Sequence, residues 1–261
     1  MAVTTILLPF HQDERIGRDS ITLPAGIPTT EVAPQLDVVE TQWQRLAALY
    51  NHLADEVATR LDSPEPTTVV TGDCLALLGT LAGTQRAGLS PSLVWFDAHG
   101  DVHTVASSTS GYLGGMALRM AVGGDPDLLT RPLGMATLPE AQAVLVDARD
   151  LDPAEKEYLA QAAVTHTSVD TMDAALLPGS GPVILHVDLD VIDASEIPGL
   201  RFPAPNGPTS GSVIDALRRL LDSGRVAVLD IACPWYDPRD EDELRRRAAL
   251  LARVLELRAS N

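Results

Sequence analysis

The sequence is poor in lysine and in positive charge. Lys156 is its single lysine, and Lys and Arg together number 19 against 36 Asp and Glu, which gives a net charge of −17. A surface this acidic argues against nucleic-acid binding, because that function needs clustered basic side chains. Strong acidity keeps a protein soluble and can concentrate cations near a cleft.

Cysteine and long apolar runs are also scarce. Two cysteines, Cys74 and Cys233, are too few for a disulfide framework. No stretch approaches the roughly 18 apolar residues of a membrane-spanning helix. Residues 5–10 are apolar, but the run is short and lacks the basic flank of a secretion signal. We therefore expect a cytoplasmic protein with neither membrane nor nucleic-acid partners.

Short apolar segments alternate with amphipathic ones, and most of the apolar segments are unbroken β-branched or leucine runs. Strands buried on both faces of a parallel sheet have this pattern. Strands are predicted at Thr4–Phe10, Thr67–Thr71, Ser92–Asp97, Ala143–Asp147, Val164–His166, Val183–Asp188 and Arg225–Ile231. Helices are predicted near 37–61, 75–87, 113–122, 153–162, 211–222 and 241–258. No repeat or low-complexity linker interrupts them, so one doubly wound α/β domain over 1–261 is the simplest prediction.

Chemically distinctive side chains follow several of these strands directly. They fall in the stretches "TGDC" at 71–74, "DAHGDVH" at 97–103, "DLD" at 188–190 and "DIAC" at 230–233. Ligands bind at the carboxyl ends of the strands in such sheets. Asp97, His99, Asp101 and His103 are spaced by two, which puts all four on one side of an extended segment.

Four carboxylates at one sheet edge would repel each other unless they were protonated or neutralised by a cation. Two divalent metal ions that share bridging carboxylates fit the number of ligands, and such a pair makes water nucleophilic at neutral pH. Carboxylate and imidazole ligands favour Mn²⁺, with Zn²⁺, Fe²⁺ or Co²⁺ as alternatives. The plainer alternative is that these Asp residues are helix caps and turn formers.

The motifs resemble those of the ureohydrolase (arginase/agmatinase) family over about residues 67–235. "DAHGD" is similar to the family's DAHxD, and "HVDLDVIDASEIPG" at 186–199 is similar to its DxDxxDPxxxPxxG. "TGDC" stands where the family has GGDH, and "SGYLGGM" at 110–116 stands where it has SGxxHGM. The resemblance implies a three-layer α/β domain with a mostly parallel sheet of about eight strands. It also implies a binuclear manganese centre that hydrolyses guanidino compounds.

Carried over by position, the resemblance makes Asp97 and Asp188 bridging ligands of two metal ions. Cys74 and Asp101 would complete one metal site, and His99 and Asp190 the other. Asp101 would also act in catalysis, as activated water attacks the amidino carbon. Cys74 replaces a family histidine, and a thiolate shifts the preference toward Zn²⁺ or Fe²⁺. A branch that cleaves N-hydroxyarginine has a similar cysteine and a GYLGGM-like stretch.

Two further departures affect catalysis and the grip on the guanidinium. Gly114 stands where arginases have a histidine thought to transfer protons, so Tyr112, His103 and His11 are candidate replacements. Cys233 stands where a glutamate holds the substrate guanidinium, and it is expected on the pocket wall opposite Cys74. Glu14 is a candidate replacement for that glutamate.

The remaining departures affect the rest of the substrate. Ser110 is retained, but His103 and Tyr112 replace asparagines that grip the amino-acid end of arginine, so a small molecule other than standard L-arginine is expected. Arg201 is a candidate for holding an anionic group. Three hypotheses stay open: hydrolysis of a linear amidine, hydrolysis of an amide or formimino group, and a catalytically inactive relative that binds a metabolite or partner. The family's frequent trimers and hexamers make a homo-oligomer an expectation.

Overall fold

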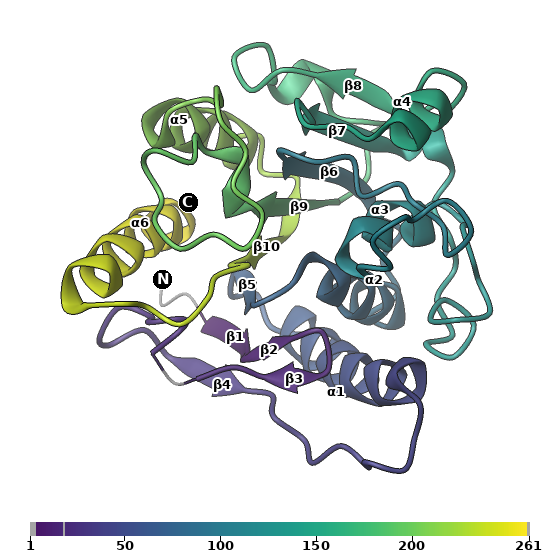
Figure 1. Ribbon diagram of the computed structural model, residues 1–261, viewed down its shortest axis with the longest axis horizontal. Helices are drawn as coiled ribbons and strands as arrows, with labels where there is room; N and C mark the ends of the chain where they lie inside the picture. Colours follow the sequence, from purple (N-terminus) through teal and green to yellow (C-terminus); the bar gives the residue numbers. More distant parts are fainter. Residues whose placement is uncertain (1–3, 18, 260–261) are drawn as a thin grey trace.

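The computed structural model describes residues 4–17 and 19–259 and has one large sheet at its centre (Figure 1). Eight strands pair in the order β4-β1-β5-β10-β9-β6-β7-β8, and each neighbouring pair is parallel. These strands are β1 Thr4–Leu8, β4 Thr29–Glu31, β5 Thr67–Thr71, β6 Ser92–Asp97, β7 Ala143–Asp147, β8 Thr165–Thr167, β9 Val183–Asp188 and β10 Val226–Ala232. A separate antiparallel hairpin consists of β2 Phe10–His11 and β3 Glu14–Arg15.

Helices cover both faces of the sheet. Hydrophobic residues of α1 Gln42–Leu61, α2 Leu77–Arg86, α3 Ala117–Ala121 and α4 Pro153–Leu159 pack into one core cluster. Those of α5 Ser210–Leu221 and α6 Glu241–Ala259 pack into a second cluster on the other face. The prediction of a three-layer α/β fold with about eight mostly parallel strands is therefore confirmed. Among the described residues, no helix has both the length and the apolar character needed to cross a bilayer.

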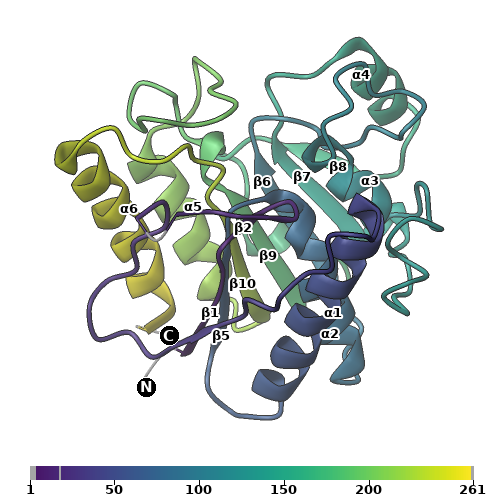
Figure 2. The ribbon, with the colours of Figure 1, turned by 60° about the horizontal axis from the view of Figure 1, so that its bottom comes forward.

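The central strands end level with one another, and this positions the site. In the register of the sheet, Ala232 lies beside both Thr71 and Asp188. Each residue of β5, β6 and β9 is buried, as expected for strands covered on both faces. The loops at the carboxyl ends of the strands gather on one side of the molecule, while the start of β1 and the end of α6 lie toward the opposite side (Figure 2).

The structure corrects three details in the N-terminal part of the chain. The predicted strand Thr4–Phe10 stops at Leu8, and the chain then turns into the β2–β3 hairpin. The edge strand β4 was not predicted because it has three mostly exposed residues and no apolar run. The predicted helix 37–61 begins at Gln42, where the Thr41 side chain and Gln44 form a capping box.

Five short 3₁₀ helices complete the elements: η1 Cys74–Ala76, η2 Gly114–Met116, η3 Glu140–Gln142, η4 Ala174–Leu176 and η5 Leu189–Val191. Two of them follow strands and carry expected metal ligands. Asp73 caps η1 by accepting from the Leu75 N–H, and Asp188 caps η5 by accepting from the Asp190 N–H. The tight turns hold Cys74 and Asp190 at the sheet edge.

Candidate metal centre and substrate pocket

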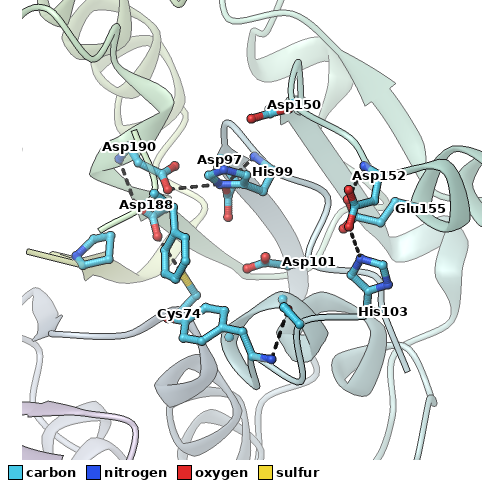
Figure 3. A pocket seen from close by; sticks show the side chains of 16 residues that line it. Cys74, Asp97, His99, Asp101, His103, Asp150, Asp152, Glu155, Asp188 and Asp190 are labelled. Atoms are coloured by element: carbon cyan, nitrogen blue, oxygen red, sulfur yellow. Dashed lines mark hydrogen bonds and ion pairs between the residues drawn. The ribbon is translucent and has the colours of Figure 1, made fainter. Parts of the chain in front are cut away.

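A cavity of about 250 Å³ opens at the carboxyl ends of β5, β6 and β9 (Figure 3). It brings together nine of the predicted site residues, including all six expected metal ligands. The lining residues are Cys74, Asp97, His99, Asp101, His103, Ser110, Tyr112, Gly114, Gly115, Asp150, Asp152, Glu155, Asp188, Asp190, Phe202 and Pro234.

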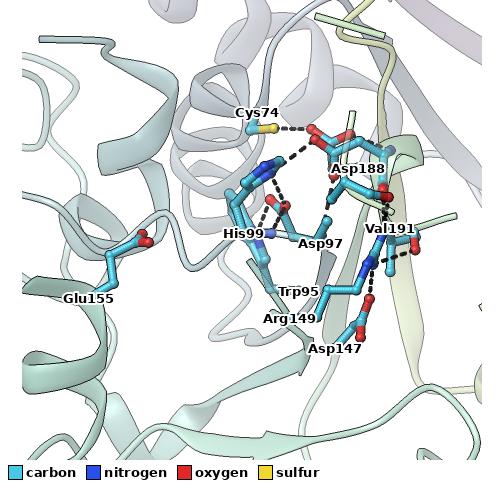
Figure 4. Close-up of polar contacts among 12 residues, drawn as sticks. Cys74, Trp95, Asp97, His99, Asp147, Arg149, Glu155, Asp188 and Val191 are labelled. Atoms are coloured by element: carbon cyan, nitrogen blue, oxygen red, sulfur yellow. Dashed lines mark hydrogen bonds and ion pairs between the residues drawn. The ribbon is translucent and has the colours of Figure 1, made fainter. Parts of the chain in front are cut away.

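Three groups of candidate metal-binding atoms lie in this cavity: one consists of His103, Asp152 and Glu155, and the other two lie next to each other. Ligand atoms of Cys74, Asp97 and Asp101 all lie within 4.8 Å of one another, and the same holds for Asp97, His99 and Asp190. Asp97 belongs to both groups. Asp188 joins them, because its Oδ2 contacts the Cys74 thiol (Figure 4). The two candidate groups are therefore adjacent and share the Asp97 carboxylate.

Backbone and indole N–H groups orient these carboxylates. Trp95 Nε1 donates to Asp97 Oδ2 at 2.9 Å, and the His99 N–H donates to Asp97 Oδ1 at 2.7 Å. The Asp190 N–H donates to Asp188 Oδ1 at 2.8 Å. Each carboxylate keeps lone pairs directed elsewhere, as metal ligands must.

Burial and mutual repulsion make the charge of these groups costly. Burial raises the pKa of Asp188 well above its usual range, and the charges of Asp190 and Asp97 raise it further. Burial and the charge of Asp97 likewise raise the pKa of Asp101 well above its usual range. The pKa of Asp190 rises to about 6 through burial and the Asp97 charge. Burial and the neighbouring Asp188 also raise the pKa of the Cys74 thiol.

His99 supplies the nearest positive charge. Its Nδ1 lies 3.1 Å from Asp190 Oδ2 and 3.2 Å from Asp97 Oδ1. Burial disfavours the imidazolium, but hydrogen bonds to Asp190 and Asp97 outweigh that effect and raise the pKa of His99 to about 12. One imidazolium cannot neutralise four carboxylates, so this centre calls for further positive charge.

A second buried cluster lies beneath the centre. His186 Nδ1 is 2.7 Å from Asp230 Oδ1, and Thr80 donates to the other oxygen of Asp230. The His186 ring stacks on Trp95 with 3.9 Å between centroids. These contacts give His186 a structural position behind the indole that orients Asp97.

The opposite end of the cavity carries acidic groups that were not predicted. Asp150, Asp152 and Glu155 line it, and Asp152 Oδ2 lies 3.1 Å from His103 Nε2. The Ser107 hydroxyl lies 3.1 Å from the other ring nitrogen of His103, so this imidazole is held at the wall. Asp152 and Glu155 also form the capping box of α4. Their position after β7 could have predicted that they line the cavity, because the residues that follow β5, β6 and β9 also line it.

Two of the expected residues lie at the mouth of the cavity. Ser110 lines it and accepts a hydrogen bond from the Tyr112 N–H at 3.2 Å. The Tyr112 hydroxyl donates to buried Asp73 at 2.8 Å. His11 lies behind Tyr112, with ring centroids 5.8 Å apart, and is not itself a lining residue.

Three expected substrate-binding residues lie outside the lining of this cavity, which corrects their predicted positions. Cys233 is 1% exposed, follows the end of β10 and packs in the second core cluster, and burial and the charge of Asp188 raise the pKa of its thiol. Both cysteines are free thiols. Glu14 is exposed on the β2–β3 hairpin. Arg201 donates to the Trp235 carbonyl and stacks over Tyr236.

Comparison with known proteins gives a family for this architecture. The arginase family model matches residues 19–256. The arginase of Eremothecium gossypii is 30% identical over 175 residues, which cover 61% of this chain and 44% of that protein. The N(omega)-hydroxy-L-arginine amidinohydrolase of Streptomyces lavendulae is 34% identical over 191 residues, which cover 71% of this chain and 66% of that protein.

The solved structure of Bacillus subtilis arginase shares the fold, with a TM-score of 0.79 at 23% identity and 98% of each chain covered. The alignment with the Eremothecium gossypii arginase covers less than half of that protein's length. The family model, however, matches nearly the whole of this chain, and the predicted resemblance is confirmed. The protein belongs to the arginase family.

Proposed function

We propose that this protein is a binuclear metal-dependent hydrolase that cleaves a C–N bond in a linear amidine or guanidino compound other than standard L-arginine. The observation that carries the proposal is the pair of ligand groups that share Asp97 within one cavity. The likeness to an N(omega)-hydroxy-L-arginine amidinohydrolase supports an N-hydroxyguanidino substrate.

The donor set fits two divalent ions. Three buried carboxylates, one imidazole and one thiol lie around the shared Asp97, and burial together with the neighbouring charges raises the pKa of Asp101, Asp188 and Cys74. A cation reverses that electrostatic cost, because it stabilises the deprotonated ligands. Cys74 and Asp101 would hold one ion, His99 and Asp190 the other, and Asp97 and Asp188 both.

When bound, the ions would supply the charge that lowers the pKa of water and stabilises the tetrahedral intermediate. Carboxylates and imidazole suit Mn²⁺, while the thiolate of Cys74 adds preference for Zn²⁺ or Fe²⁺. The Asp101 side chain accepts no hydrogen bond from other described residues, so it can receive the proton of the attacking water and pass it to the leaving amine.

The acidic end of the cavity would orient the substrate. Asp150 and Asp152 are exposed there, with Glu155 behind them, so this end attracts a cationic group such as an α-ammonium. The substrate would then span the cavity, with its amidino carbon at the metal ligands and its ammonium at Asp152.

Metal analysis and turnover test this proposal. Purified protein should hold two divalent ions per chain, and it should release ornithine from Nω-hydroxy-L-arginine faster than from L-arginine. A panel that includes agmatine and a formimino compound would distinguish the amide or formimino alternative. Two tightly bound ions without turnover of any compound would favour an inactive, ligand-binding relative, and absence of metal binding would contradict any metal-dependent hydrolase.

A further inference from the structure

The Tyr112 ring occupies the space that a side chain at position 114 would need. A Cβ added to Gly114 would lie 2.5 Å from Tyr112 Cε1, 2.7 Å from Cζ and 2.8 Å from the hydroxyl oxygen. Real Cβ atoms do not approach other atoms so closely, so the ring can take this position only beside glycine. The position of the Tyr112 ring in the cavity wall therefore depends on glycine at position 114.

The hydroxyl of this ring has a fixed hydrogen-bond direction. It donates its proton to Asp73 Oδ2 at 2.8 Å, and Asp73 is 1% exposed. The other oxygen of Asp73 accepts from the Leu75 N–H at 2.8 Å. His11 Nδ1 lies 3.3 Å from Asp73 Oδ2 and also 3.1 Å from the Gly72 carbonyl. A hydroxyl whose proton is committed in this way presents its free lone pairs as an acceptor.

Neighbouring rings hold the acceptor at the cavity. Phe202 packs against Tyr112 with 4.5 Å between centroids, and His11 stacks on it at 5.8 Å with an interplanar angle of 18°. Tyr112 and Phe202 line the same cavity as Cys74 and Asp101. Tyr112 thus lies on the wall of the cavity that contains the candidate metal ligands, and Cys74 and Asp101 are close enough for their charges to act on its hydroxyl.

An amidino or guanidino group is rich in N–H donors, so its site needs acceptors. The carboxylates nearest the reacting carbon would be taken up by the metal ions, and Cys233 is not among the residues that line the cavity. Resting on the proposed function, we infer that the Tyr112 hydroxyl oxygen accepts a hydrogen bond from an N–H or N–OH of the substrate's amidino group and so selects substrates that carry this donor.

The test compares Tyr112→Phe with wild type by titrating Mn²⁺-loaded protein with Nω-hydroxy-L-arginine, L-arginine and L-ornithine. Loss of one hydrogen bond to a buried acceptor should weaken binding of the two amidino compounds about tenfold or more. Binding of L-ornithine, which lacks the amidino group, should stay unchanged. A general disturbance of the pocket would weaken all three ligands alike.

Two further variants sharpen the result. Gly114→Ala keeps the hydroxyl but displaces the ring, and it should reproduce the selective loss. Tyr158→Phe is a matched control, because that hydroxyl bonds Glu140 and lies outside the lining of the cavity. Equal amidine affinity in wild type and Tyr112→Phe, or no amidine binding by metal-loaded wild type, would overturn the inference. Selective amidine binding without turnover would instead uphold the inference while the proposed hydrolysis fails.

Discussion

Trp95 Nε1 donates a hydrogen bond to Asp97 Oδ2, and both side chains are at most 1% exposed. Asp97 is the residue common to the two groups of candidate metal ligands. The indole therefore orients the carboxylate on which both sites depend. The stacked His186 ring and its partner Asp230 hold the indole from below, so the orientation extends into the core of the sheet.

Replacing Trp95 by Phe should weaken metal binding without abolishing it. The ring remains, but Asp97 loses one of the hydrogen bonds that orient it, and loss of such a partner typically lowers metal affinity about 10- to 100-fold. Competition with a fluorescent chelator measures the change. Trp235→Phe is the control, because Trp235 Nε1 is buried and has no hydrogen-bond partner among the described residues. Equal metal affinity in the two variants would contradict the orienting role of Trp95.

The two cysteines should respond differently to removal. Cys74→Ala deletes a candidate ligand, so we expect affinity for one of two Mn²⁺ or Zn²⁺ ions to fall by at least about tenfold. Cys233→Ala removes a buried sulfur in the far core cluster, and it should cost about 1–2 kcal/mol of stability while leaving two ions bound. Metal content after dialysis and thermal unfolding separate these effects. Two ions retained in Cys74→Ala with undiminished affinity would show that the thiol is not a ligand.

The clustering of the candidate metal ligands was predictable because short-range spacing and strand ends decide their placement. Asp97 ends β6, His99 and Asp101 come soon after it, and a parallel sheet brings the ends of β5 and β9 to the same edge. Cys233 was misplaced because it comes directly after β10, where strand alternation no longer fixes the direction of a side chain. Only the folded chain reveals that Tyr112 fills the space beside Gly114, since that contact depends on the path of an irregular loop.

Close packing of α1 against α2 should make Gly83 intolerant of substitution. A Cβ there would lie 2.5 Å from the Ala54 carbonyl oxygen and 2.7 Å from Val57 Cβ. Moving the helices apart to accept it should cost about 1–3 kcal/mol. Gly181→Ala is the control, because its nearest atom would be 3.4 Å away. Urea unfolding measures both variants, and equal stability would contradict the expected clash.

The metal-free protein should lose stability as pH rises from about 4 to 6, in part through Asp190. Burial and the Asp97 charge raise the pKa of this carboxyl from 3.8 to about 6 in the folded state. In this range the unfolded chain releases a proton that the folded chain retains, so rising pH favours unfolding. The contribution is about 3 kcal/mol when complete, and it should be absent from Asp190→Asn.

Urea unfolding in EDTA at several pH values tests this sign directly. The difference in unfolding free energy between wild type and Asp190→Asn isolates the titration of one carboxyl from that of the other acidic groups. Wild type should become progressively less stable relative to the variant between pH 4 and 6. Saturating Mn²⁺ should remove the penalty in wild type above pH 6, because the ion stabilises the ionised carboxylate. A difference that stays constant with pH, or that changes in the opposite direction, would show that Asp190 is not held protonated by its surroundings.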